Sequence, residues 1–287
     1  MNHSIDLPGI GNARELGNYI IGDKVVKSSV LLRTARLDQA NPEAIKRLEQ
    51  EYHVQTVIDF RMAEEQLQMP DPIIPGAENL KAPVLEVEDT LVLNPGIKKA
   101  LGGPGNDFIE KSKEILAMYN DPKADRMALF NMMYDYGMLD DSTYVLFLLG
   151  ERGKNAYRTF FDALFKLEPG HAILWHCADG KDRTGCAAML LLFALGASRE
   201  TVMEDYLLTN IYNAQKLDVI RKQVAPLNFE QKKLDTLLFM SGGVTEAYMN
   251  RAIDTLIERY GSVTGYLKQE LGIEESGLDA LRAIFLI

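Results

Sequence analysis

At residues 172–195 the chain reads Ala-Ile-Leu-Trp-His-Cys-Ala-Asp-Gly-Lys-Asp-Arg-Thr-Gly-Cys-Ala-Ala-Met-Leu-Leu-Leu-Phe-Ala-Leu. The run at 172–176 has the length and composition of a strand buried on both faces of a parallel sheet. The run from about Thr184 to Leu195 is typical of a buried helix, and a short polar loop joins the two. A strand, a tight loop and a helix in this order are typical of an α/β protein.

The loop between the strand and the helix predicts a site for a tetrahedral anion. Loop amides that point inward and the positive end of a helix dipole together attract negative charge. Five residues separate Cys177 from Arg183, which is enough for the loop to curl around a dianion. Gly180 supplies a backbone conformation that other residues resist. The loop residues predicted to bind the anion are Ala178, Asp179, Gly180, Lys181 and Thr184.

Cys177 and Arg183 are the candidates for nucleophile and phosphate clamp. A thiol within such a site loses its proton readily, and the thiolate is a strong nucleophile for phosphorus. The planar guanidinium of Arg183 matches two phosphate oxygens at once, which a lysine cannot do. Thr184 can donate its hydroxyl to the sulfur, and His176 is expected to orient the loop. A chance alignment of a buried cysteine and a surface arginine is disfavoured, because every part of the loop fits the same anion-binding site.

The motif Cys177-x5-Arg183-Thr184, preceded by His176, resembles the signature of the protein tyrosine phosphatase superfamily. Its interior, with Lys181 and Asp182, is similar to that of bacterial tyrosine phosphatases and atypical lipid phosphatases. Further blocks that resemble this family begin at Asn12, Leu32, Ile58, Glu204 and Tyr260. The resemblance implies a cysteine-phosphatase fold, with a central, mainly parallel sheet flanked by helices. It also implies hydrolysis of a phosphomonoester through a cysteinyl-phosphate.

The general acid of such a reaction has two candidate locations. Many tyrosine phosphatases take it from a Trp-Pro-Asp loop, but the single tryptophan here, Trp175, belongs to the strand before Cys177. Asp182 is the first choice, because it lies in the phosphate loop itself and the resemblance implies this position for the acid. Asp140 or Asp141, about forty residues upstream, is the second choice.

Three further residues leave two interpretations open. Lys181 is either a substrate contact at the mouth of the anion site, which we favour, or a solvated lysine. Arg61 either reaches the rim of the pocket as a substrate-binding residue or pairs with a glutamate at 64–65. Cys186 is favoured as a core residue, although it could trap an oxidised Cys177 in a disulfide.

The rest of the chain predicts one phosphatase domain over residues 1–287 with a helical C-terminal part. A small hairpin near 19–26 is followed by a helix that starts at Asn41 and Pro42. The stretch 93–141 indicates a helical insertion, either a surface excursion or a lid over the site. Later apolar stripes predict helices that Gly261 and Gly272 close.

Composition limits the classes of protein that remain. The formal charge of −10 disfavours a nucleic-acid-binding protein, and no apolar run is long enough to predict stable membrane insertion. Two cysteines and the lack of a signal-peptide pattern predict a cytoplasmic protein, although secretion without a signal stays open. No cluster has metal-ligand spacing, and the chemistry needs no cofactor.

The sequence therefore predicts a cysteine-dependent phosphatase without metal or cofactor. The expected substrates are phosphotyrosine proteins, with phosphoserine or phosphothreonine and phosphoinositides as further classes. Inorganic phosphate is expected as product and inhibitor. Two alternatives from other classes are a rhodanese-type sulfurtransferase, which also uses a cysteine in an anion-binding loop, and a non-catalytic phosphate-binding module. The intact Arg183-Thr184 pair disfavours the first, and the presence of both Cys177 and Arg183 disfavours the second.

Overall fold

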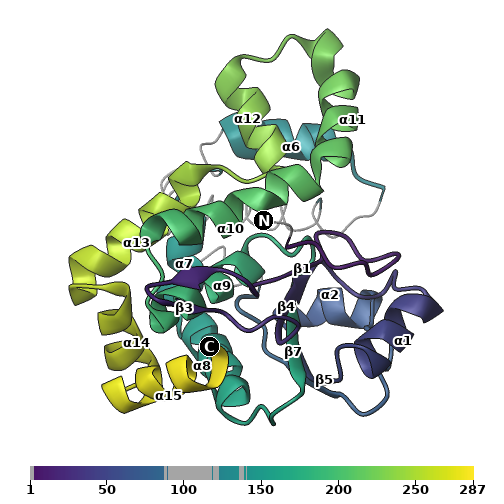
Figure 1. The fold of residues 1–287 in the computed structure, drawn as a ribbon. Coiled ribbons are helices and arrows are strands. Elements are labelled where there is room, and N and C mark those ends of the chain that lie inside the picture. Colours follow the sequence, from purple (N-terminus) through teal and green to yellow (C-terminus); the bar gives the residue numbers. More distant parts are fainter. Residues whose placement is uncertain (1–2, 87–88, 90–117, 119–122, 136–138, 140) are drawn as a thin grey trace.

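The fold is built around a five-stranded sheet, which we describe from a computed structural model (Figure 1). The structure describes residues 3–86, 89, 118, 123–135, 139 and 141–287. The strand order is β1 (Arg14–Glu15), β4 (Leu31–Thr34), β7 (Ala172–His176), β5 (Val54–Asp59) and β6 (Glu78–Lys81). Strands β4, β7, β5 and β6 run parallel and β1 is antiparallel. The predicted mainly parallel α/β sheet is confirmed.

Strand β7 lies at the centre of the sheet, between β4 and β5. Its side chains alternate between two apolar clusters, because successive residues of a strand point to opposite faces. Ile173 and Trp175 belong to the larger cluster, with α8 (Glu151–Phe165) and α9 (Arg183–Leu195). Leu174 belongs to the smaller cluster, with α1 (Pro42–Gln50). The apolar character of 172–176 therefore follows from burial on both faces.

Local signals in the sequence match the ends of several elements. Asn41 caps α1, because its side chain accepts a hydrogen bond from the Ala44 amide at 2.9 Å. Gly261 and Gly272 adopt the left-handed conformation after α13 (Glu246–Tyr260) and α14 (Val263–Leu271). The predicted hairpin consists of β2 (Ile20–Ile21) and β3 (Lys24–Val25). These predictions are confirmed.

Further helices cover the larger cluster and the edge of the sheet that carries the loop (Figure 1). They are α2 (Ala63–Gln68), α7 (Thr143–Leu149), α10 (Arg199–Tyr212) and α15 (Glu275–Phe285). Two more helices, α11 (Ala214–Val224) and α12 (Gln231–Met240), follow α10 along the chain and stand apart from the sheet. In the part of the chain that the structure describes, no helix has the length and apolar content required to cross a membrane.

Most of the predicted insertion at 93–141 lies outside the described residues. Its described helix, α6 (Arg126–Asp135), stands with α11 and α12 beyond the main body (Figure 1). Phe130 of α6 packs with Val224 and Leu237 in a small apolar cluster of their own. The insertion therefore contributes at least one helix, which joins helices from the C-terminal half of the chain.

Candidate active site

The loop from Cys177 to Asp182 follows the central strand and leads directly into α9. Gly180 has a φ of +65°, and a Cβ atom there would lie 2.3 Å from the Thr34 carbonyl oxygen. Real Cβ atoms do not approach backbone that closely, so the position requires glycine for both conformation and space. The turn that brings Arg183 back towards Cys177 thus depends on Gly180.

We expect Gly180→Ala to destabilise the fold by roughly 1–3 kcal/mol, since it adds both strain and a clash with backbone. Gly170 is the matched control, because its φ is +84° and nothing lies within 4 Å of an added Cβ. Chemical denaturation of Gly180→Ala and Gly170→Ala measures both costs. Equal losses in the two variants would contradict the close packing of the loop against β4.

The carbonyl oxygens of the loop are held from outside. The Asn12 side-chain amide donates to the carbonyls of Asp179 and Gly180, each at 3.0 Å. Arg33 Nη2 also donates to the Gly180 carbonyl at 2.9 Å, and the Arg36 amide donates to that of Ala178 at 3.1 Å. Because the carbonyls are bound on the outer side, the loop can turn its amides towards an anion.

Beneath the loop lies a buried cluster of two arginines and one aspartate. Asp205 accepts from Arg14 Nε at 3.1 Å and from Arg33 Nη1, and all three residues are almost fully buried. Burial and the neighbouring Arg33 lower the pKa of Arg14 to about 10. Burial opposes ionisation of Asp205, but the two arginines outweigh it and lower its pKa. The cluster carries net positive charge and holds the loop through Arg33.

Arg183 lies at the start of α9 with its guanidinium directed to Glu65 of α2. Its Nη1 and Nη2 bond the two carboxylate oxygens of Glu65 at 2.6 and 3.2 Å. Burial opposes the charge of Glu65, but Arg183 outweighs burial and lowers the pKa of this carboxylate. The same Glu65 accepts from the Met62 amide at 2.8 Å, which anchors it at the start of α2. Arg183 is thus oriented before any ligand binds.

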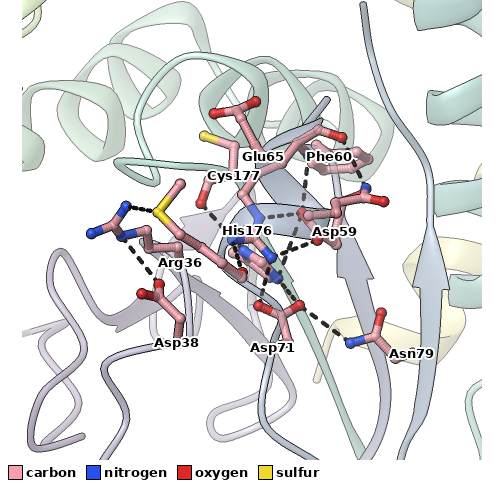
Figure 2. Close-up of polar contacts among 12 residues, drawn as sticks. Arg36, Asp38, Asp59, Phe60, Glu65, Asp71, Asn79, His176 and Cys177 are labelled. Carbon is pink, nitrogen blue, oxygen red and sulfur yellow. Dashed lines mark hydrogen bonds and ion pairs between the residues drawn. The ribbon is translucent and has the colours of Figure 1, made fainter. Parts of the chain in front are cut away.

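His176, the last residue of β7, contacts both the backbone of Cys177 and the carboxylate of Asp71 (Figure 2). Its Nδ1 lies 3.2 Å from the Cys177 carbonyl oxygen, and its Nε2 lies 2.9 Å from Asp71 Oδ2. Burial opposes ionisation of Asp71, but His176 and Arg61 lower its pKa. His176 therefore holds the backbone at Cys177, and Asp71 holds His176.

Arg61 is arranged differently from both interpretations of the sequence. It is fully buried and binds Asp59 and Asp71, each at 2.8 Å, rather than the pocket rim or a glutamate at 64–65. Asp59 ends β5 two residues earlier, so its carboxylate is within reach of the guanidinium. Asp59, Asp71 and His176 place ligand atoms within 4.8 Å of one another, as a metal site does. However, Arg61 supplies the positive charge to both carboxylates there.

Asp182 and Lys181 bind each other, and Lys181 is turned away from the solvent. Asp182 Oδ1 accepts from Lys181 Nζ at 2.9 Å and from Tyr144 at 2.6 Å. Lys181 is 3% exposed, and its ammonium lies 4.0 Å from the centre of the Phe239 ring. It is therefore neither a solvated lysine nor exposed at the mouth of the site. Asp141 is exposed just before α7, and Asp140 lies outside the described residues.

A cavity of about 690 Å³ opens beside the loop, a size typical of ligand sites. Ala178 and Asp179 line it together with Glu65, Arg36 and Arg126 of α6. Asp179 also pairs with Lys216 of α11 at 3.1 Å. The described part of the predicted insertion therefore borders this cavity.

The remaining predicted groups, on Cys177, Thr184 and Cys186, are all buried. Cys177 is 1% exposed, and the Thr184 hydroxyl has no hydrogen-bond partner among the described residues. That hydroxyl is available as a donor to the sulfur. Cys186 lies within the larger apolar cluster, where burial raises the pKa of its thiol. Both cysteines are free thiols.

Several residues that support the loop could not be predicted from local sequence. The position of Glu65 suggests only a pairing with Arg61, and Asp71 and Tyr144 carry no local signal. In contrast, three of the blocks that resemble the phosphatase family contain such residues, namely Asn12, Arg33 and Asp205. The resemblance could therefore have led to them, although no spacing rule would have shown their contacts.

The arrangement is suited to nucleophilic transfer of a phosphoryl group. It combines a cysteine, a preoriented arginine, a glycine-dependent loop at a helix N-terminus, and a carboxyl group at the end of the loop. Such a loop stabilises the charge of a phosphoryl group by fixed donors rather than by reorganised water.

Comparisons with known proteins agree with this chemistry. A tyrosine-protein phosphatase of Cupriavidus necator, whose name carries the qualifier "Putative", is 28% identical over 280 residues, 96% of this chain and 87% of that protein. The triple specificity protein phosphatase PtpB of Mycobacterium tuberculosis is 31% identical over 141 residues, 46% of this chain and 50% of that protein. The model of the tyrosine phosphatase family matches residues 5–287, so the chain belongs to the tyrosine phosphatase family.

Proposed function

We propose that this protein hydrolyses phosphotyrosine in proteins through a cysteinyl-phosphate, with Cys177 as nucleophile. The observation that carries the proposal is the placement of Cys177 and Arg183 at the two ends of one loop, between the central strand and a helix N-terminus. The family match over residues 5–287 favours this chemistry over sulfur transfer.

The proposed reaction has two steps. The Cys177 thiolate attacks phosphorus, the bond to the leaving oxygen breaks, and Asp182 gives its proton to that oxygen. Water then attacks the cysteinyl-phosphate, Asp182 takes up a proton, and the sulfur leaves while the Thr184 hydroxyl donates to it. Arg183 and the loop amides hold the phosphoryl oxygens throughout, and this stabilisation is strongest in the transition state.

Phosphoserine, phosphothreonine and phosphoinositides are further substrate classes within the proposal. The printed name of the Mycobacterium tuberculosis relative describes triple specificity for that protein. Lys181 and Asp182 carry the lipid-phosphatase resemblance of the loop. Because Lys181 is buried against Phe239, it would have to leave this ring before it could contact an inositol phosphate.

The test is phosphate release from a phosphotyrosine peptide, a phosphoserine peptide and a phosphoinositide panel. Turnover of the phosphotyrosine peptide is expected, and the other substrates show how far the specificity extends. Sulfur transfer from thiosulfate to cyanide without phosphate release would contradict the proposal. Binding of inorganic phosphate without turnover of any substrate between pH 5 and 8 would contradict it as well.

We expect Asp182→Ala to slow substrates with poor leaving groups by roughly 10²–10⁴-fold, the usual contribution of a general acid. Phosphotyrosine and alkyl phosphates need a proton on the leaving oxygen, whereas p-nitrophenolate leaves without one. The measurement is kcat for p-nitrophenyl phosphate, phenyl phosphate and the peptide. Asp141→Ala is the control, because Asp141 is the alternative candidate for the general acid that lies within the described residues. A loss confined to Asp141→Ala would move the role to that residue.

A further inference from the structure

Asp182 occupies the N-cap position of α9, but it does not cap the helix. An aspartate at this position ordinarily accepts a hydrogen bond from an amide of the first helical turn. Here the side chain makes no cap hydrogen bond. The amides at the start of α9 belong to the anion site described above, so a carboxylate bound to them would compete with phosphate.

Two donors from outside the helix hold the carboxylate instead. Tyr144 Oη donates to Asp182 Oδ1 at 2.6 Å, and Lys181 Nζ donates to the same oxygen at 2.9 Å. The Asp182 side chain is 26% exposed, while Lys181 beside it is 3% exposed. One face of the carboxyl group is therefore anchored in the protein and the other faces outward.

Tyr144 is a rigid donor. It is fully buried on α7, and its hydroxyl lies 2.8 Å from that of Tyr206 on α10. Its ring packs edge-on against Tyr206 and Tyr248, with centroids 6.0 and 5.6 Å away. Burial, together with the nearby Asp182 carboxylate, raises the pKa of Tyr144 well above its ordinary value. The Tyr144 hydroxyl therefore keeps its proton at neutral pH and can remain a donor.

We propose that Tyr144 is a positioning residue that holds the Asp182 carboxyl group away from the N-terminus of α9. This keeps the helix amides available for phosphate and directs Oδ2 towards the leaving group. Oδ1 already accepts two hydrogen bonds, so the proton that Asp182 transfers is carried on Oδ2. When that proton passes to the leaving oxygen, Tyr144 and Lys181 stabilise the carboxylate that remains. The inference rests on the proposed function of Asp182.

The test compares Tyr144→Phe with Tyr266→Phe. Tyr266 is a matched control, because it is fully buried and its hydroxyl donates to the Leu148 carbonyl of the same helix, α7, at 2.5 Å. Calorimetry gives the affinity for inorganic phosphate without any turnover. Steady-state kinetics with p-nitrophenyl phosphate and phenyl phosphate give the dependence on the leaving group.

In Tyr144→Phe we expect phosphate binding to weaken by about tenfold, the worth of one hydrogen bond to a charged group. We expect kcat to fall more for phenyl phosphate than for p-nitrophenyl phosphate. In an Asp182→Ala background, adding Tyr144→Phe should change neither quantity, because no carboxylate remains to move. Tyr266→Phe should leave both close to wild type.

Two results would overturn the inference if the wild type binds phosphate and turns over substrate. One is equal behaviour of Tyr144→Phe and Tyr266→Phe in both measurements. The other is an undiminished effect of Tyr144→Phe in the Asp182→Ala background. A wild-type protein that neither binds phosphate nor releases it from any substrate would instead overturn the proposed function itself.

Discussion

Replacing Cys177 by serine is expected to lower turnover by about four orders of magnitude or more, because a serine hydroxyl at this site lacks a base to activate it. Serine has nearly the shape of cysteine, so the loop should still bind inorganic phosphate. Rapid quenching of the wild type with a labelled substrate should yield a peptide phosphorylated at Cys177. The same experiment on Cys177→Ser should yield none.

Cys186→Ala is the control for the loss of a thiol. Cys186 is fully buried in the larger apolar cluster and lies in the same strand-loop-helix unit as Cys177. We expect this variant to retain turnover and the labelled Cys177 peptide. Substantial activity in Cys177→Ser, or label on another residue, would show that this loop is not the reaction centre.

Replacing Asp205 by asparagine is expected to destabilise the fold by about 3–5 kcal/mol, the cost of breaking a buried ion pair from one side. Asp205 bonds Arg14 and Arg33, both fully buried, so two guanidinium groups would lose their counter-charge. Because Arg33 also holds the Gly180 carbonyl, phosphate binding should weaken as well. Urea denaturation measures the first effect and calorimetry the second.

The control for Asp205→Asn is Asp254→Asn. Asp254 pairs with Arg199 at 2.7 Å, but both side chains are well exposed, at 49% and 37%. Exposed pairs contribute about 0–1 kcal/mol, so this variant should unfold near the wild-type midpoint. Similar losses of unfolding free energy in the two variants would mean that the buried cluster stabilises the fold no more than an exposed ion pair does.

Three buried or partly buried carboxylates also predict how stability depends on pH. The pKa values of Asp205, Glu65 and Asp71 lie below their ordinary values of 3.8, 4.5 and 3.8. A carboxyl group whose pKa is lower in the folded state stabilises the fold at any pH above its pKa in the unfolded state. This stabilisation is lost as the pH falls through its pKa in the folded state. The free energy of unfolding should therefore decline below about pH 4.5, and less steeply in Asp205→Asn.

Local sequence determined the elements whose signals lie within a few residues. The apolar run at 172–176 and the helix after it required burial on both sides, and therefore a central strand in a parallel sheet. Asn41, Gly261 and Gly272 marked helix ends, because capping and left-handed turns are properties of single residues. The spacing of Cys177 and Arg183 was sufficient to predict that one short loop between a strand and a helix brings them together, and the structure has this loop.

Only the tertiary structure decided which partners these groups have. Three hydrogen-bonded pairs connect residues that are far apart in the sequence. They are Glu65 with Arg183, Asp71 with His176, and Tyr144 with Asp182, separated by 118, 105 and 38 positions. No periodicity links such residues, because the contacts arise when separate helices and strands pack together. Arg61 and Lys181 differ, because each pairs with a carboxylate only one or two positions away, Asp59 or Asp182. Their burial still depends on packing, since Arg61 also binds Asp71 and Lys181 lies against the Phe239 ring. The sequence therefore determined which chemical groups the loop carries, while packing decided which side chains are available to it.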